Sequence, residues 1–145
     1  MPRQPRSHLD DGVYHVTARA TAGEPLFVVE LDRQDFLELL GSTAQRSRWV
    51  CHAYCLMSTH YHLILQAARE ELSTGMRRLN DVYAKRFNRR HERRGHLFET
   101  RFSAYVVRDE RHLLAAQSYV LENPVRAGIC RRARDWPWSG SALPR

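Results

Sequence analysis

Two histidines separated by a single residue, His60 and His62, could together bind a metal ion. Side chains in an extended strand alternate between its two faces, so both imidazoles would lie side by side and Tyr61 would point the other way. Neutral imidazole is a ligand for many divalent transition metals. The alternative is that both histidines are simply solvated at the start of a strand. Strand spacing alone does not decide between these two interpretations.

A second polar pair lies in a later segment with helical periodicity. Tyr119 and Asn123 are four residues apart and would share one face of a helix. An amide oxygen is a hard ligand that suits Mg²⁺ or Mn²⁺ beside imidazole, and an activated tyrosine can form covalent intermediates. The alternative is that Tyr119 is an ordinary packed aromatic residue, and these residues by themselves leave both interpretations open.

The chain is strongly basic, with a formal net charge of +7 at pH 7, and Lys85 is its only lysine. Arginine binds phosphate bidentately and stacks on bases, so a basic domain rich in arginine points to nucleic acid. Six of the ten residues in 85–94 are Lys or Arg, and one is acidic. This cluster predicts a surface that contacts phosphates, with four side chains fanning outward: Arg86, Arg89, Arg90 and Arg93.

Length and composition indicate a single domain of residues 1–145, with 43% hydrophobic residues. No apolar run approaches the ~20 residues of a membrane span, and residues 1–10 lack the apolar core of a secretory signal. We therefore expect a cytoplasmic, nucleoid-associated protein with no membrane partner. Cys51 and Cys55 could suggest zinc beside the histidines, but we favour their packing as small hydrophobic residues in an apolar strand.

The pattern of apolar residues predicts how the chain is organised. Residues 1–10 would be a basic arm carrying Arg3 and Arg6, and residues 129–145 a tail. Between them we expect strands at 12–19, 49–57, 60–67 and 96–107, and helices at 32–48, 71–91 and 109–123. This order predicts an α+β fold, a ferredoxin-like βαββαβ core with an antiparallel sheet and an extra C-terminal helix that carries Tyr119.

Local signals refine these boundaries. Asp32 would be the N-cap of the first helix, and Ser73 or Thr74 that of the second. Pro124 would end the third helix, because the residue before a proline is disfavoured in helical conformation. The two tryptophans of the tail, Trp136 and Trp138, are expected to pack over the edge of the core, with base stacking as the alternative.

Three segments resemble single-tyrosine HUH transposases of the IS200/IS605-like type, and in particular the branch associated with repetitive extragenic palindromes (REP). They are HAYCLMSTHYH (52–62), FNRRHERRGHLF (87–98) and SYVLENPVRAG (118–128). The resemblance runs from about Gly12 to Ser141. It implies that His60 and His62 hold Mg²⁺ or Mn²⁺, with Asn123 as the third ligand. It also implies that Tyr119 attacks single-stranded DNA, forms a 5′-phosphotyrosine link and leaves a free 3′-OH.

The function expected from this resemblance is that of a transposase, a strand transferase that cleaves and rejoins single-stranded hairpin or palindromic DNA. It would act as a monomer or a homodimer. One alternative is a catalytically idle or domesticated module that binds DNA or RNA, and another is a metallonuclease that uses water and does not need Tyr119. Candidate DNA-binding residues are Arg3, Arg6, Lys85, Arg86, Arg89, Arg90, Arg93, Arg94, Arg101 and Arg126.

Overall fold

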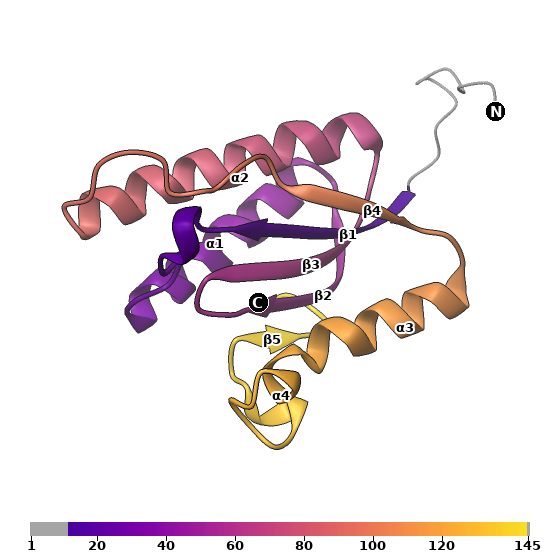
Figure 1. Cartoon of the computed structure of the whole chain (residues 1–145). Coiled ribbons are helices and arrows are strands. Elements are labelled where there is room, and N and C mark those ends of the chain that lie inside the picture. The colour runs from indigo at the N-terminus through magenta and orange to yellow at the C-terminus, as the bar shows by residue number, and fades with distance from the viewer. Residues whose placement is uncertain (1–11, 145) are drawn as a thin grey trace.

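A single antiparallel sheet is the centre of the computed structural model, which describes residues 12–144. Arg3 and Arg6 lie outside these residues. The strand order is β4-β1-β3-β2-β5 (Figure 1). The strands are β1 (Gly12–Arg19), β2 (Val50–Leu56), β3 (His60–Ala67), β4 (Ser103–Val107) and β5 (Ser139–Gly140). The order of the first four strands and their alternation with helices confirm the predicted ferredoxin-like core.

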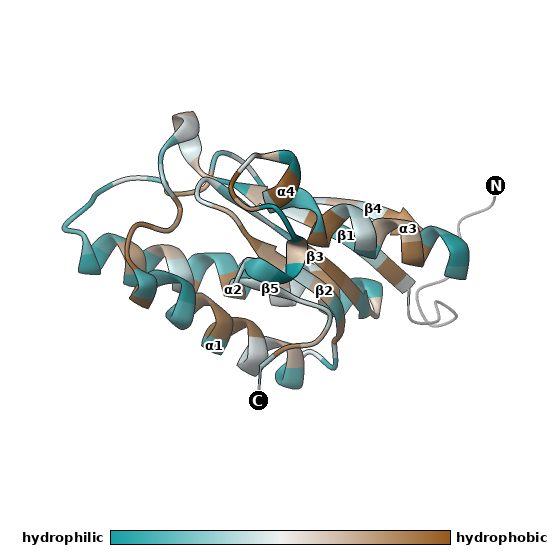
Figure 2. Cartoon of the chain, turned by 90° about the horizontal axis from the view of Figure 1, so that it is seen from below, coloured by the Kyte–Doolittle hydropathy of each residue, from teal (hydrophilic) through white to brown (hydrophobic). Residues whose placement is uncertain are grey.

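Helices cover both faces of the sheet. The long helices α1 (Glu30–Arg46) and α2 (Arg69–Arg90) lie on one side, and α3 (Glu110–Leu121) and α4 (Asn123–Arg126) on the other (Figure 2). Residues 12–144 also contain two short 3₁₀ turns, η2 (Thr21–Gly23) and η3 (Ala133–Asp135). Within residues 12–144, no helix combines the length and the hydropathy that crossing a bilayer requires.

The alternation of side chains along the strands produces two separate cores. Tyr61, Leu63 and Leu65 of β3 are fully buried in the larger core, against α1 and α2. Ile64 points the other way, into a smaller core with Ala116 and Val120 of α3. One strand therefore contributes both to a face covered by the two long helices and to a face against which α3 and Trp136 of the tail pack.

The cysteines of β2 pack as the sequence predicted. Cys51 lies against the larger core and Cys55 lies in the smaller one, so the two thiols are on opposite faces of the sheet. Burial raises the pKa of each thiol to about 12. Separated by the sheet, they cannot bind one zinc ion together, and the prediction of core cysteines is confirmed.

Both predictions of helix caps were wrong. The first helix begins at Glu30 with Val29 as its N-cap, so Asp32 lies inside the first turn and accepts backbone N–H bonds from Val28 and Val29. The second helix begins at Arg69, where no side chain caps it, so neither Ser73 nor Thr74 is an N-cap. A carboxylate can bond to the N-terminal amides from the third helical position as well as from the cap, and spacing alone does not separate the two.

Two other differences concern the second half of the chain. The fourth strand begins at Ser103, and the residues before it form an irregular segment. This segment meets the end of β1 through the Glu99 N–H, which donates to the Arg19 carbonyl, and through a bridge between Phe98 and Ala20. Pro124 does not end the helical region, because it lies in the first turn of α4, where a missing N–H costs no hydrogen bond. The tail packs as predicted: the Trp136 indole N–H donates to the Leu56 carbonyl at 3.1 Å.

Gly41 in α1 and Gly75 in α2 form a matched pair for testing how the helices pack. A Cβ at Gly75 would lie 2.3 Å from the Trp49 ring, whereas nothing lies within 4 Å of a Cβ at Gly41. We expect Gly75→Ala to lower the free energy of unfolding by about 1–3 kcal/mol through overpacking. Gly41→Ala should raise it by up to about 1 kcal/mol through helix propensity. Urea unfolding measures both, and a stabilised Gly75→Ala variant would contradict the close packing of α2 on Trp49.

Candidate active site

His60 and His62 lie side by side on the face of the sheet that α3 covers. Strand pairing places His60 opposite Arg19 and His62 opposite Thr17, and the two imidazole centroids are 5.1 Å apart. Tyr61 points into the larger core, where it is fully buried and its hydroxyl donates to the Asn80 amide oxygen. The predicted arrangement of these three consecutive residues is therefore confirmed.

Both histidines are held in the neutral form that metal binding requires. Burial, the neighbouring His60 and His15 rings, and the positive charges of Arg126 and Arg19 lower the pKa of His62 to about 3. Burial and the charge of Arg19 also lower the pKa of His60. Neutral imidazoles on one strand face keep a lone pair available for a divalent cation.

His15 of β1 is a third histidine at this site, and the sequence did not single it out. Its Nε2 lies 3.1 Å from Nδ1 of His62, and its ring centroid is 5.9 Å from that of Tyr119. Burial, together with the charge of His112, lowers its pKa. The alternation of side chains along β1 predicts which face of the strand carries His15. Only the pairing of β1 with β3 places His15 beside His62.

Tyr119 reaches the same site from α3. Its ring centroid lies 6.2 Å from that of His62, and 52% of the residue is exposed to solvent. The Arg126 guanidinium lies over the ring, 4.0 Å from its centroid, and donates to the Tyr119 carbonyl at 2.6 Å. Because Val120 is buried on the sheet side of α3, its neighbour Tyr119 can remain open to a ligand.

The ring nitrogens show how a metal would fit. Nδ1 of His60 bonds to the Thr59 hydroxyl at 3.1 Å, and Nδ1 of His62 bonds to His15, which leaves Nε2 of each ring for an ion. Among residues 12–144, no three His, Cys, Asp or Glu side chains are placed to hold a metal together. The remaining ligands would therefore be neutral or external oxygens, a set that the predicted Asn123 amide fits.

Asn123 begins α4 and is partly buried. Glu122 joins α3 to α4 with helical backbone angles, and its N–H donates to the Ser118 carbonyl. Within the described part of the chain, its side-chain amide makes no hydrogen bond to either histidine. Its role as a metal ligand stays a prediction.

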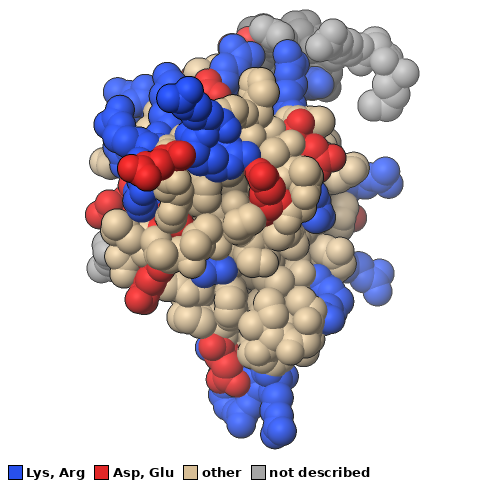
Figure 3. All heavy atoms as spheres, turned by 60° about the vertical axis from the view of Figure 1, so that its left-hand side comes forward, with Lys and Arg blue, Asp and Glu red and all other residues tan. Residues whose placement is uncertain are grey.

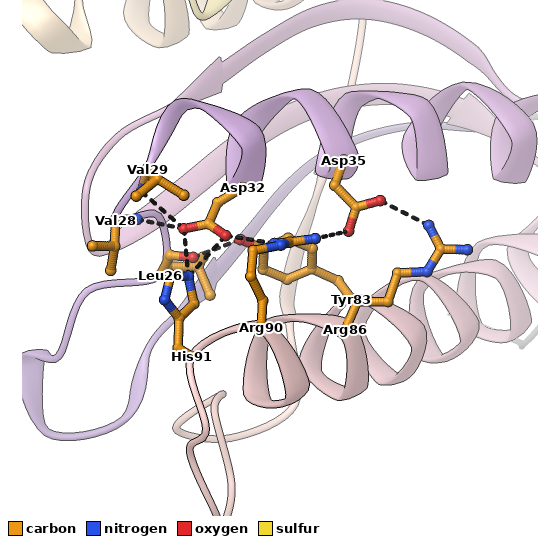
Figure 4. Close-up of polar contacts among 9 residues, drawn as sticks. All are labelled: Leu26, Val28, Val29, Asp32, Asp35, Tyr83, Arg86, Arg90 and His91. Carbon is orange, nitrogen blue, oxygen red and sulfur yellow. Dashed lines mark hydrogen bonds and ion pairs between the residues drawn. The ribbon is translucent and has the colours of Figure 1, made fainter.

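The basic cluster at the end of α2 differs from its prediction, because α1 presents two acidic residues to it (Figure 4). Arg90 forms ion pairs with both Asp32 and Asp35, and Arg86 pairs with Asp35 at 2.7 Å. Arg93 pairs with Glu24. The prediction that these side chains point outward was therefore wrong for Arg90 and Arg93, whose side chains are 23% and 21% exposed.

Asp32 is the centre of this network and is fully buried. Burial acts to raise its pKa, but the backbone N–H groups of Val29 and Val28, with His91 and Arg90, outweigh burial and lower the pKa. The carboxylate therefore stays ionised at neutral pH, and it joins the start of α1 to the end of α2.

Other basic residues remain available to a ligand. Lysine and arginine side chains gather over the C-terminal end of α2 in the view of Figure 3. Four predicted DNA-binding residues are exposed and have no acidic partner within residues 12–144: Lys85, Arg89, Arg94 and Arg101. Arg126, also exposed, lies over Tyr119 instead of in this cluster.

Comparison with known proteins identifies similar chains. Residues 9–123 match the sequence profile of the family described as Transposase IS200 like. A curated protein of Haemophilus influenzae, assigned as a REP-associated tyrosine transposase, is 26% identical over 98 residues. The aligned region is 60% of this chain and 56% of that protein, so the match spans little more than half of the relative's length.

Two solved structures share the fold. A REP-associated tyrosine transposase bound to a REP hairpin superimposes with a TM-score of 0.77 at 17% identity, covering 96% of this chain and 82% of that one. A Deinococcus radiodurans protein assigned as a transposase gives a TM-score of 0.56 at 18% identity, covering 84% and 97%. At these identities, the likeness establishes the architecture.

The buried histidines predict how stability depends on pH. Because the folded-state pKa of His62 is lowered to about 3, the unfolded chain binds more protons between that value and about 6.5, its ordinary pKa. The free energy of unfolding should therefore decrease as the pH falls through this window. Urea unfolding at several pH values should show that the free energy of unfolding depends less on pH in His62→Gln than in wild type. His96→Gln, which replaces an exposed histidine, should show the wild-type dependence. Equal slopes in wild type and His62→Gln would contradict the burial of His62.

Proposed function

The chain belongs to the IS200-like transposase family, and we propose that it cleaves and rejoins single-stranded, hairpin-forming DNA through a covalent link to Tyr119. The observation that carries this proposal is the position of the Tyr119 ring, 6.2 Å from that of His62 and exposed to solvent. A nucleophile beside two neutral imidazoles is the arrangement that metal-assisted phosphoryl transfer needs.

The proposed reaction has two balanced steps. The Tyr119 hydroxyl oxygen attacks the phosphorus of a phosphodiester, and the bond from phosphorus to the 3′-oxygen breaks. The proton that leaves the phenol is balanced by the one gained on the released 3′-OH. In the second step, a 3′-OH attacks the 5′-phosphotyrosine and releases the phenol. One phosphodiester replaces another in each step, so no external energy source is required.

Residues of this chain would prepare the site in separate ways. His60 and His62 would hold Mg²⁺ or Mn²⁺ through Nε2, with Asn123 as a third ligand, and the bound ion would offset negative charge on the scissile phosphate. The Nδ1 atom of His62 is held by His15. Arg126 places a positive charge 4.0 Å from the centre of the ring on which negative charge develops when the proton leaves.

Hairpin DNA with palindromic repeats is the proposed substrate. The similar solved structure at a TM-score of 0.77 is a REP-associated tyrosine transposase bound to a REP hairpin. In this chain, Lys85, Arg89, Arg94 and Arg101 are exposed and have no acidic partner in the described residues, so they can bind phosphates. The protein would act as a monomer or a homodimer.

Two other functions would use the same fold differently. A catalytically idle binding module would need the basic surface but not Tyr119. A metallonuclease would use water as its nucleophile and form no covalent intermediate. We favour the strand transferase because α3 holds Tyr119 on the sheet face that carries both histidines.

We predict that Tyr119→Phe loses cleavage and covalent attachment, because it removes the attacking oxygen while leaving the ring in place. The assay incubates the protein with labelled single-stranded hairpin DNA and Mn²⁺, then separates products on a denaturing gel. Tyr105→Phe is the matched control, since Tyr105 is 66% exposed on the edge strand β4. Wild type and Tyr105→Phe should both form the adduct, and EDTA should abolish it in both. Cleavage by Tyr119→Phe at the wild-type rate would support the metallonuclease instead.

The arginines at the end of α2 and just after it allow a second comparison. Arg89→Gln combined with Arg94→Gln should reduce the slope of log affinity against log salt, by about 0.7–0.9 for each phosphate that the variant no longer binds. Arg90→Gln should instead lower the free energy of unfolding by about 2 kcal/mol, because it removes a charged hydrogen-bond partner from buried Asp32. Salt titration of hairpin binding and urea unfolding measure the two effects. An unchanged salt slope in the double variant would mean that Arg89 and Arg94 do not contact the DNA.

A further inference from the structure

A groove separates α2 from the chain segment that follows it. After α2 the chain turns back and runs alongside this helix to β4 (Figure 1). The groove has a volume of about 700 Å³ and includes residues 95–102 in its lining. It lies on the other side of this segment from the candidate active site and plays no part in the proposed phosphoryl transfer.

The lining combines apolar rings with basic side chains and with the carboxylates of Asp81 and Glu99. Phe98 and Phe102 are partly buried and pack against the larger core, and both contribute to the groove. Phe98 is positioned by an edge-to-face contact with Tyr61, with centroids 6.4 Å apart. Arg77 and Lys85 of α2 line the opposite wall and are exposed. Aromatic faces beside basic side chains are the features that bind unpaired nucleotides.

Asn80 supplies a polar group in this groove and is 9% exposed. Its amide oxygen accepts the hydroxyl of Tyr61, which fixes the orientation of the side chain. The amide nitrogen has no hydrogen-bond partner within the described residues, so it can donate to a bound group. This nitrogen is not among the buried atoms of residues 12–144 that lack a partner, so it is open to solvent in the groove and accessible to a ligand.

The groove is connected to the candidate active site. A smaller cavity of about 200 Å³ is lined by Thr17 and Arg19, which are the strand partners of His62 and His60. Residues 99–101 line both this cavity and the groove. A strand bound at the histidines can therefore cross this segment and place a neighbouring nucleotide in the groove.

We propose that the groove between α2 and residues 95–102 binds an unpaired nucleotide of the DNA substrate. The base packs against Phe98 and Phe102, Asn80 donates to it, and the phosphate lies near the basic side chains. The volume is in the range of small-ligand sites. Bases within a duplex are stacked on each other, so the groove selects single-stranded DNA. This inference rests on the proposed function, because the active site must hold the strand for its neighbour to reach the groove.

Arg77 and Arg78 provide a matched test on one helix. Both are exposed residues of α2, but only Arg77 lines the groove. The probes are a blunt DNA hairpin and the same hairpin with a single-stranded extension, bound in EDTA so that no cleavage occurs. We expect wild type to bind the extended hairpin more tightly than the blunt one. Arg77→Gln should reduce this preference several-fold and Arg78→Gln should leave it unchanged.

Phe102→Leu tests the stacking contribution while keeping apolar volume. It should reduce the preference for the extension by about fivefold or more. With an extension that lacks its bases, Phe102→Leu and wild type should bind equally. If this variant does not fold, as judged by thermal unfolding, Arg77→Gln against Arg78→Gln still decides the question.

The groove proposal is overturned if wild type, Arg77→Gln and Phe102→Leu all prefer the extended hairpin to the same degree. It is also overturned if Arg78→Gln reduces this preference as much as Arg77→Gln does. These outcomes are independent of the Tyr119 adduct. If the covalent adduct forms but the groove variants bind like wild type, the proposed strand transferase stands and the groove proposal fails. If the groove variants lose the preference but no adduct forms, the protein is a binding module.

Discussion

The register between β1 and β3 is the constraint on which the rest of the structure depends. It aligns Gly12 with Ala67 and Arg19 with His60. Because side chains alternate along a strand, a slip of one residue would exchange the two faces of the sheet. Such a slip would expose Tyr61 and Leu63, which are fully buried. Burial of these side chains in the larger core therefore keeps the two histidines on the opposite face, which α3 covers.

The two faces have different tasks. On the covered face, buried Asp32 joins the start of α1 to the end of α2, and Arg90 satisfies its charge. Arg90 and Arg93 of the basic cluster therefore stabilise the fold through ion pairs. The opposite face has a smaller core, so His60 and Tyr119 stay partly exposed to solvent. The ion pairs that join the two long helices and the candidate active site therefore lie on opposite sides of one sheet.

The edge of the sheet connects these two faces. The irregular segment before β4 borders the small cavity beside the histidines on one side and the groove along α2 on the other. Residues 99–101 line both of these cavities, and Arg101 is exposed among them.

The sequence by itself determined the strand β3, the common face of His60 and His62, the opposite orientation of Tyr61 and the helix that carries Tyr119. These features follow from local periodicity, which the order of apolar residues records directly. It did not determine that His15 contacts His62, that Arg90 and Arg93 turn to acidic partners, or that two residues of the tail form β5. Each of these depends on contacts between residues distant in sequence. Only the tertiary structure decides such contacts, because side-chain partners are set by the packing of separate elements and not by spacing along the chain.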